Sequence, residues 1–518
     1  MRYTVVSSAE FTYPDRFEYP SSSKSIGIFG ARGGYASFQL LLRGVSHAHP
    51  VFEGLPEGVV PEIYALRSVM VERNHGIDEK SYAPHYPERV APYRIYDCLR
   101  PLGADGALDE EGDEKQSGLY IALKLERDAE PGVYPFTLSL ADGGEKISGS
   151  LEIFAATLPE ETLTIILGYS RAPLEQFHGL KPGTAEYEAL DKKYLAALRR
   201  MHQNMMYVGG VKATEVAPRK WEFDFTELVK MIGDFEAAGM KYFWLPSVGW
   251  RKSWSQSTIL LHGTIPSMSY EGYCYLSQYL PALRDVLDEH GWTDRCVMGV
   301  ADEPNAENAT EFRALCGLIH RIVPEIRLGD AMSWGNLHGA LDVWVPLNAE
   351  YDRHRDEIET LRENGGEIWH YVCCGPREPG YINRFMDYPL LSTRYLHWGN
   401  YRYHLTGFLH WAANRYQPGQ NPFEQNCPEH HNTDAVCFLP AGDTHVLYPG
   451  EGEPWLSMRL EAEREGAEEC EMLTALAARD PKKADEICDR VFRSFKDVEY
   501  DVAAFEEARR TLLTALSE

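Results

Sequence analysis

Hydrophobic and polar positions alternate along much of the first 160 residues, in short runs separated by turns rich in Gly and Pro. The runs at residues 38–43, 118–125, 136–140 and 146–154 are typical of β-strands, in which successive side chains point to opposite faces. Short strands with turns between them are characteristic of two packed antiparallel sheets. The pattern therefore predicts an N-terminal β-sandwich domain over residues 1–160.

From residue 161 the pattern changes to apolar runs that alternate with helical segments. The predicted strands lie at residues 164–168, 204–208, 241–245, 296–300, 326–330, 343–345, 367–372 and 408–411. The predicted helices lie at residues 185–202, 225–238, 275–290, 307–323 and 356–363, where apolar residues recur at helical spacing. Counting the weaker runs gives eight strands, and this number of β/α units predicts a TIM-like (β/α)8 barrel over residues 161–450.

The last part of the chain, residues 451–518, is predicted to be a helical segment. Asp480 and Pro481 form a favourable pair for starting a helix, and Val491 belongs to the apolar stripe that follows. The many charged residues of this segment are expected on solvated helix faces. The predicted fold class is α/β, with a β-sandwich before the barrel and helices after it.

Two adjacent carboxylates, Asp302 and Glu303, follow the buried run at residues 296–300. Pro304 cannot donate a hydrogen bond to a strand, so the strand should end before it. In parallel α/β barrels the carboxyl ends of the strands carry the catalytic side chains. The alternative is that one of these acids caps the helix that begins near residues 305–308.

An acid at this place suits the cleavage of a glycosidic bond, in which a carboxylic acid protonates the leaving oxygen. Most glycosidases use two carboxylates about 5 to 10 Å apart. Neighbours on a strand point to opposite faces, so Asp302 and Glu303 can share a site only where the strand breaks its pleat. Adjacent Asp-Glu pairs occur in glycosidases whose nucleophile is the 2-acetamido group of the substrate itself.

Aromatic residues near the predicted strand ends are candidate stacking platforms for sugars, although each is equally compatible with a place in the core. The candidate substrate contacts are Tyr371, Trp334, Trp398, Trp411 and the amides Asn414 and Asn204. The His and Cys residues match no zinc spacing, so no metal is expected. No cofactor is expected either.

Composition and charge narrow the range of functions further. The 518 residues carry a net charge of −27, which argues against nucleic acid and anionic membranes as partners, because phosphate binding needs clustered Lys and Arg. No apolar run reaches the length of about 18 residues that a membrane helix needs. Ten scattered cysteines and an N-terminus without a signal-like apolar core predict a cytoplasmic protein with reduced thiols. A homo-oligomer is compatible with the sequence.

Several segments, taken in order and with their spacing, resemble glycoside hydrolase family 123. They are residues 36–40, 128–134, 301–304, 341–346, 366–373, 407–412, 446–450 and 457–466. Two departures from the family pattern occur at residues 33–37, which lack the usual Glu, and at residues 465–469. They indicate a divergent branch and leave the exact sugar open.

The resemblance implies an exo-acting β-N-acetylgalactosaminidase that retains anomeric configuration by substrate assistance. Asp302 would stabilise the acetamido group, Glu303 would act as general acid and then general base, and Tyr371 would contact the acetamido oxygen. One alternative is a two-carboxylate glycosidase acting on another sugar, with Asp330 or Glu350 as the partner of Glu303. The other is a carbohydrate-binding protein without catalysis.

Overall fold

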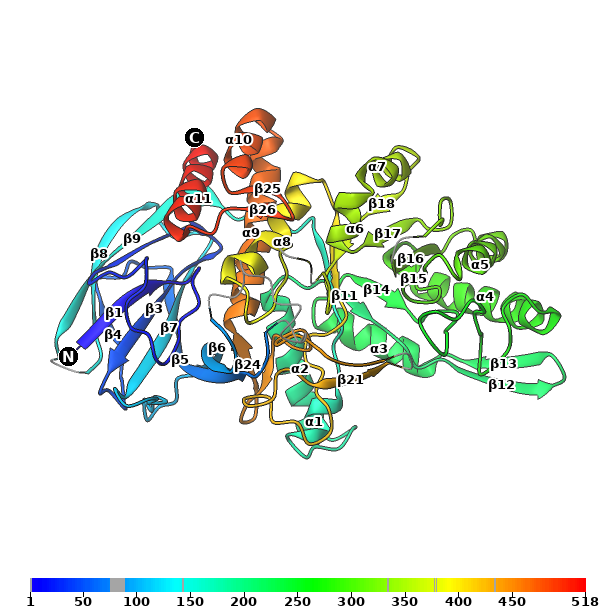
Figure 1. Cartoon of the computed structure of the whole chain (residues 1–518), viewed down its shortest axis with the longest axis horizontal. Coiled ribbons are helices and arrows are strands. Elements are labelled where there is room, and N and C mark those ends of the chain that lie inside the picture. Colours follow the sequence, from blue (N-terminus) through cyan, green and yellow to red (C-terminus); the bar gives the residue numbers. More distant parts are fainter. Residues whose placement is uncertain are drawn as a thin grey trace.

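The chain is a mixed α/β protein whose sheet-rich N-terminal region and C-terminal helices adjoin a set of parallel strands. The computed structural model describes residues 2–74, 89–141, 144–332, 335–376, 378, 380–432 and 435–518. In Figure 1 the N-terminal sheets lie on the left and the parallel strands with their helices on the right, and the C-terminal helices stand between them. The helices that the structure describes include none long and apolar enough to cross a membrane.

Two sheets form the N-terminal region, as the alternating pattern predicts. The first has the order β1 (Arg2–Ser7), β3 (Tyr35–Arg43), β7 (Gln116–Leu125), β5 (Val59–Val71), β6 (Tyr93–Pro101), β24 (Pro454–Ser457) and β23 (Tyr448–Pro449). The second has the order β2 (Ile26–Arg32), β9 (Lys146–Thr157), β8 (Gly132–Ser139) and β4 (Val51–Glu53). Apolar side chains of both sheets, such as Leu40 of β3 and Leu151 of β9, form one buried cluster between them. Strands β23 and β24 join this region from a distant part of the sequence.

Each of the eight apolar runs predicted after residue 160 overlaps a parallel strand. The strands are β10 (Thr164–Leu167), β11 (Met205–Tyr207), β14 (Tyr242–Leu245), β15 (Cys296–Met298), β16 (Arg327–Met332), β17 (Val343–Pro346), β18 (Glu367–Ile368), β19 (His370–Tyr371) and β20 (Gly407–His410). Two short hairpins accompany them, β12 (Lys212–Ala217) with β13 (Lys220–Asp224), and β21 (Glu429–Asn432) with β22 (Ala435–Phe438).

A closed (β/α)8 barrel, which the sequence predicts, is not shown. The strands form a six-stranded sheet, β11-β14-β15-β16-β17-β18, and a three-stranded sheet, β10-β20-β19. The ladder is interrupted at Trp369, between β18 and β19. Next to β10, the backbone N–H of Asn204, the residue before β11, donates to the carbonyl of Ile165, and the side-chain amide of Gln203 bridges the carbonyls of Leu167 and Met205. The interruption has a physical cause, because these strands are only two to four residues long and form few ladder bonds.

Helices connect the strands and continue to the C-terminus. They are α1 (Ala172–Gln176), α2 (Ala185–Arg200), α3 (Thr226–Ala237), α4 (Tyr270–His290), η2 (Thr293–Arg295), α5 (Ala309–Ile322), α6 (Asn348–Arg353), α7 (Arg355–Glu363), α8 (Leu390–Arg402), α9 (Met458–Ala477), α10 (Pro481–Val491) and α11 (Val502–Ser517), with the small pair β25 (Phe492–Ser494) and β26 (Asp497–Val498) before α11. The predicted start of α10 is confirmed, since Asp480 accepts a hydrogen bond from the backbone of Lys483.

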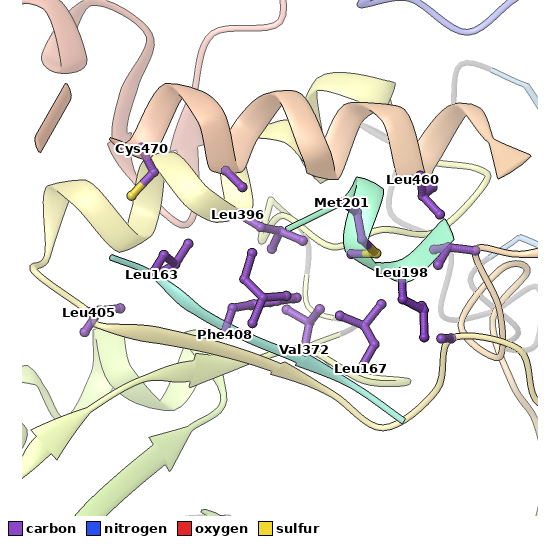
Figure 2. Close-up of a cluster of buried hydrophobic side chains, with 14 of the residues drawn as sticks. Leu163, Leu167, Leu198, Met201, Val372, Leu396, Leu405, Phe408, Leu460 and Cys470 are labelled. Atoms are coloured by element: carbon purple, nitrogen blue, oxygen red, sulfur yellow. The ribbon is translucent and has the colours of Figure 1, made fainter. Parts of the chain in front are cut away.

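The centre of the molecule is an apolar layer beneath α8 and α9. Figure 2 shows Leu396 of α8 and Leu460 of α9 above Leu167 of β10 and Phe408 of β20, with Met201 beyond the end of α2 beside them. All five residues are at most 2 % exposed. Because this cluster continues from the N-terminal sheet to α11, the parts of the chain share one core.

The prediction that the charged C-terminal residues are solvated is wrong for α9. The charged side chains of this helix are at most 7 % exposed at Arg459, Glu461, Glu463, Arg464, Glu465, Glu468, Glu469 and Glu471. Arg464 lies at the centre and pairs with Glu461 at 3.0 Å and with Glu468 at 2.7 Å. Buried charges of this kind are tolerated only when they are paired.

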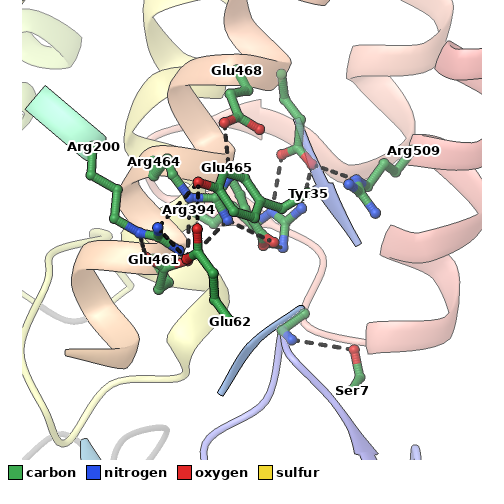
Figure 3. Close-up of polar contacts among 12 residues, drawn as sticks. Ser7, Tyr35, Glu62, Arg200, Arg394, Glu461, Arg464, Glu465, Glu468 and Arg509 are labelled. Carbon is green, nitrogen blue, oxygen red and sulfur yellow. Dashed lines mark hydrogen bonds and ion pairs between the residues drawn. The ribbon is translucent and has the colours of Figure 1, made fainter. Parts of the chain in front are cut away.

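Figure 3 shows that residues from α2, β3, β5, α8 and α11 converge on this face of α9. Arg200 of α2 joins Glu461 to Glu62 of β5, with both nitrogen–oxygen distances at 2.5 Å. Arg394 of α8 pairs with Glu465 and Glu469, and Arg509 of α11 also reaches Glu469, at 3.0 Å. The N-terminal sheet, the parallel strands and the C-terminal helices are thus tied to one buried ionic cluster.

Replacing Arg464 by Met should destabilise the protein by about 3–5 kcal/mol, because it leaves several buried carboxylates without their cation. The measurement is the urea midpoint of unfolding. Lys482→Met serves as a control, since that side chain is 87 % exposed and its loss should change stability by less than about 0.5 kcal/mol. A midpoint for Arg464→Met as high as that of the control would contradict the role of the cluster.

His202 makes the stability of this junction depend on pH. Its ring contacts Glu161 at 3.0 Å and Glu468 of α9 at 3.3 Å. Burial alone lowers the pKa of His202, but the hydrogen bonds and charges of the two carboxylates outweigh burial and raise its pKa from 6.5 to about 9. The protonated ring therefore stabilises the folded chain fully below about pH 6.5, and this stabilisation is lost as the pH rises through about 9.

We expect His202→Asn to remove this pH dependence. Asparagine tolerates the left-handed backbone of this position, where φ is 65°, so the helix end is preserved. Wild type should exceed the variant by up to about 3 kcal/mol near pH 6, and the gap should close towards pH 10. Denaturant unfolding across this range tests it, and a gap that stays constant with pH would refute the assignment.

Candidate active site

The acid pair lies just beyond the end of β15, the fourth parallel strand. The strand ends at Met298, and Asp302 and Glu303 have φ values of 51° and 42°. This left-handed backbone costs about 1–2 kcal/mol per non-glycine residue, so the surrounding structure must hold it in place. It is also the break in the pleat that two neighbouring side chains need in order to share one site. Helix α5 begins later and its N-cap, Asn308, makes no side-chain capping bond, so neither acid caps it.

Glu303 is half-buried and accepts a hydrogen bond from Tyr371, one of the predicted substrate contacts. The hydroxyl of Tyr371, at the end of β19, donates to Glu303 Oε1 at 2.8 Å. Burial and the charge of Asp302 raise the pKa of Glu303, while Tyr371 and Arg251 oppose the rise. A carboxyl group with a raised pKa is suited to act as a proton donor near neutral pH.

The side chain of Asp302 is exposed, with other ionisable groups near its carboxyl. Loss of water around the carboxyl raises the pKa of Asp302, and the nearby Arg251 guanidinium opposes the rise. The pKa of Tyr207, at the end of β11, is raised mainly by burial and secondly by the charge of Asp302. Both acids act on Tyr371 as well, so the ends of β11, β15 and β19 face one site.

Arg251 is a functional candidate that the sequence reasoning missed. It lies on the loop after β14 and donates to the backbone carbonyls of Asp302 and Glu303, the latter at 3.0 Å. The same guanidinium binds the carbonyl of Trp254, which also accepts from the Asn305 amide at 2.8 Å. The available signal was a loop rich in Trp and basic residues directly after a parallel strand, but nothing in it indicates the backbone contact.

Asp330 of β16 is the second group that lies against the acid pair. The residue is 3 % exposed, and its Oδ2 accepts from the backbone N–H groups of Val300, Ala301 and Asp302. Burial and the charge of Asp302 raise the pKa of Asp330 to about 8, against the lowering effect of these three hydrogen bonds. Its carboxyl group therefore faces the backbone beneath the acids.

The tryptophans predicted to contact substrate lie in different environments. Trp411 follows β20 and is partly exposed, and its indole N–H donates to Asp443 at 3.2 Å; its use as a sugar platform stays a prediction. Trp398 is fully buried in α8 and donates to Glu469 at 2.8 Å, so it belongs to the core instead. Trp334 lies outside the residues that the structure describes.

The two predicted amides are occupied by the backbone. Asn414 is fully buried, and its amide exchanges two hydrogen bonds with the backbone of Ser170, both at 2.8 Å. Asn204 binds the backbone of Leu163 and Ile165 and lies at the amino end of β11, the opposite end from the acid pair. Both amides fix the ends of strands and are not free to bind a sugar.

A carboxyl pair with raised pKa values at the carboxyl ends of parallel strands is compatible with a glycoside hydrolase. The model of the glycoside hydrolase 123 catalytic domain matches residues 173–476, more than half of the chain. The chain therefore belongs to glycoside hydrolase family 123, as the sequence resemblance indicates, and is an enzyme of that class. No curated protein sequence matches it.

Among solved structures, a family 123 glycoside hydrolase from Clostridium perfringens is similar over almost the whole chain. The TM-score is 0.74 at 13% identity, with 99% of this chain and 97% of that chain covered, which shows a shared fold. Two Bacteroides fragilis proteins match at 11% identity, covering 75% and 68% of this chain and 72% of each of their own. Their TM-scores of 0.25 and 0.24 carry no inference about this fold.

Replacing Tyr371 by Phe should move the alkaline limb of the activity profile to higher pH. The lost hydroxyl stabilises ionised Glu303, so its removal raises the pKa of that carboxyl, by about one pH unit for a bond to a charged group. The measurement is kcat/KM against pH. Tyr351→Phe is the matched control, because Tyr351 donates to Glu359 at 2.7 Å outside the site. An unchanged or acid-shifted limb would show that Tyr371 does not tune Glu303.

Proposed function

We propose that this enzyme releases terminal β-linked N-acetylgalactosamine, or a related 2-acetamido sugar, by exo-acting, retaining, substrate-assisted catalysis. The observation that carries the proposal is the adjacent pair Asp302 and Glu303 on a left-handed backbone at one strand end. Adjacent acids suit a reaction in which the nucleophile belongs to the substrate, because a single strand end then supplies both protein carboxyl groups.

In the first step the acetamido oxygen attacks the anomeric carbon while Glu303 gives its proton to the leaving oxygen. The C–O bond to the leaving group breaks, and an oxazolinium-like intermediate forms. Asp302 orients the acetamido group and balances the positive charge on its nitrogen, a role for which Arg251 favours the ionised form. In the second step Glu303 accepts a proton from water, which attacks the anomeric carbon and restores the acetamido group with retained configuration.

The alternative two-carboxylate mechanism has weaker support from the other candidate acids. Asp330 directs its carboxylate at the backbone beneath the site. Glu350 lies on α6 and pairs with Arg353 and with His354, the latter at 3.5 Å. Both carboxylates are thus engaged by other groups of the protein, and this favours substrate assistance.

The substrate class is supported by the fold relative and by the aromatic surface. The Clostridium perfringens enzyme was studied for glycolipid glycan hydrolysis, and we propose a glycan terminus of this kind for this chain. Trp411 would stack on a sugar face, Tyr371 would contact the acetamido oxygen once substrate displaces its bond to Glu303, and Trp334 stays a proposed contact.

We infer further that the two parallel sheets are parts of one (β/α)8 barrel. Side chains from each of these strands except β18, among them Ile166, Val297, Val345 and Leu409, form one buried cluster, as expected for a barrel interior. The division into residues 1–160, 161–450 and 451–518 stays a prediction, as does the cytoplasmic location.

Glu303→Gln should lower kcat on a 2-acetamido aryl glycoside with a poor leaving group by about 100-fold or more, because that bond needs protonation. The loss should be much smaller on a substrate with a strongly activated leaving group, whereas Asp302→Asn should impair both. Steady-state kinetics on the two substrates measure the difference.

A thiazoline analogue of the 2-acetamido sugar should inhibit the wild-type enzyme, because it mimics the cyclic intermediate. Matched aryl glycosides with and without the 2-acetamido group provide the control for substrate assistance. Full activity without that group, or a trapped covalent glycosyl-enzyme, would reject the proposal and support the two-carboxylate alternative.

A further inference from the structure

The segment that carries the acid pair is held by hydrogen bonds on both edges of its backbone. On one edge, the N–H groups of Val248 and Gly249 donate to the carbonyls of Gly299 and Val300, at 3.1 and 2.7 Å. Further along the same segment, Arg251 binds the carbonyls of Asp302 and Glu303. All of these donors belong to the loop after β14, so one loop holds the carbonyl groups of the segment.

The N–H groups of the segment converge on a single side-chain atom. Asp330 Oδ2 accepts from Val300 at 3.3 Å, from Ala301 at 2.9 Å and from Asp302 at 3.1 Å. Val300 and Ala301 lie between the end of β15 and the left-handed pair, and Asp302 is the first member of that pair. Asp330 belongs to the neighbouring strand β16, so its contact ties the backbone of the acid pair to the parallel sheet.

We propose that Asp330 is a positioning residue, which holds Asp302 and Glu303 in their left-handed, catalytically competent backbone. The proposal rests on the functions proposed above for the two acids. A left-handed pair of non-glycine residues persists only where its surroundings over-determine it, and three converging N–H groups provide such a constraint. Asp330 acts through the backbone and does not itself touch the substrate.

The contact needs an acceptor oxygen and does not need a negative charge. Burial and Asp302 raise the pKa of Asp330 to about 8, so its neutral form prevails at pH 7 and its carbonyl-type oxygen can still accept all three bonds. Asparagine has nearly the same shape and also carries one carbonyl oxygen. The positioning hypothesis therefore separates Asp330→Asn, which keeps the acceptor, from Asp330→Ala, which removes it.

A matched control lies at the other end of β16. Asp342 Oδ2 accepts from the backbone N–H of Leu328 at 2.8 Å and pairs with His320 at 3.0 Å. It thus makes the same kind of carboxylate-to-backbone contact, here between the residue before β17 and the backbone of β16. Because it precedes β17, it lies at the amino ends of the strands, away from the acid pair.

The experiment measures kcat and KM for Asp330→Asn, Asp330→Ala and Asp342→Ala, on aryl 2-acetamido glycosides with good and poor leaving groups, together with thermal unfolding. We expect Asp330→Ala to lose about 100-fold in kcat, since a displacement of about 1 Å in a reacting group has this effect, with a smaller change in KM. Asp330→Asn should restore activity to within a few-fold of wild type, and Asp342→Ala should lower only the unfolding temperature.

Two results would overturn the proposal. Equal kcat values for Asp330→Ala and Asp342→Ala would make the contact merely structural, and an Asn variant as inactive as the Ala variant would make Asp330 a group that must ionise. If Asp330→Ala does not fold, Asp330→Glu replaces it, since it keeps the carboxylate but moves it by one methylene, and full activity of this variant would also overturn the proposal. Loss of the need for a 2-acetamido group would refute only the proposed function, because the contrast between Asn and Ala would remain.

Discussion

The structure depends on the buried ionic face of α9. Arg464 is 1 % exposed and has carboxylates around it, so removing either sign would leave an uncompensated charge in the interior. Its surroundings also include the ring of Tyr35 from β3, which lies between the guanidinium groups of Arg464 and Arg200 at 4.3 and 4.6 Å. Apolar packing tolerates small shifts, whereas paired charges with defined hydrogen-bond directions do not, and the cluster therefore fixes how the N-terminal sheets meet the parallel strands.

A second set of buried charges extends this constraint towards the active site. Arg459 of α9 pairs with Asp97 of β6 at 2.9 Å and donates to the carbonyl of Gly442 at 2.6 Å. The next residue, Asp443, accepts the indole N–H of Trp411. The N-terminal sheet thus supports, through α9, the loop that orients the proposed sugar platform. A region that contributes no acid to the site can still influence substrate binding through this chain of contacts.

The sequence predicted the elements that have a simple period and missed those that do not. The parallel strands could be predicted because each carries an apolar run between turn signals. Helix α8 was missed because residues 390–401 are all buried, and a helix buried on every side has no polar face and no apolar stripe. The charges of α9 were misread for a related reason: a charged residue predicts exposure unless its partner is known, and Arg200, Arg394 and Arg509 lie far away in the sequence.

The site residues could be predicted from the sequence where the signal is local, and not where the contacts join distant segments. The acid pair could be located because one local segment carries both the strand and the acids. Arg251 could not be linked to it, and Asp330 was considered only as a catalytic partner of Glu303, since both residues act through backbone contacts between different loops and strands. Asn204 was misjudged because only strand direction shows that the start of β11 lies opposite the acids, and Trp398 because strand-end and helix aromatics look alike in sequence.

The geometry of the acid pair follows from these constraints taken together. Two neighbouring residues serve one site only if the backbone leaves the extended conformation, and the left-handed conformation that achieves this costs free energy. That cost is offset by hydrogen bonds on both edges of the segment, from Asp330 on one side and from the loop carrying Arg251 on the other. A backbone held in this way lets a single strand end supply both protein carboxyl groups. In the mechanism proposed above, the nucleophile then comes from the substrate, and the strand end needs to supply no third carboxyl group.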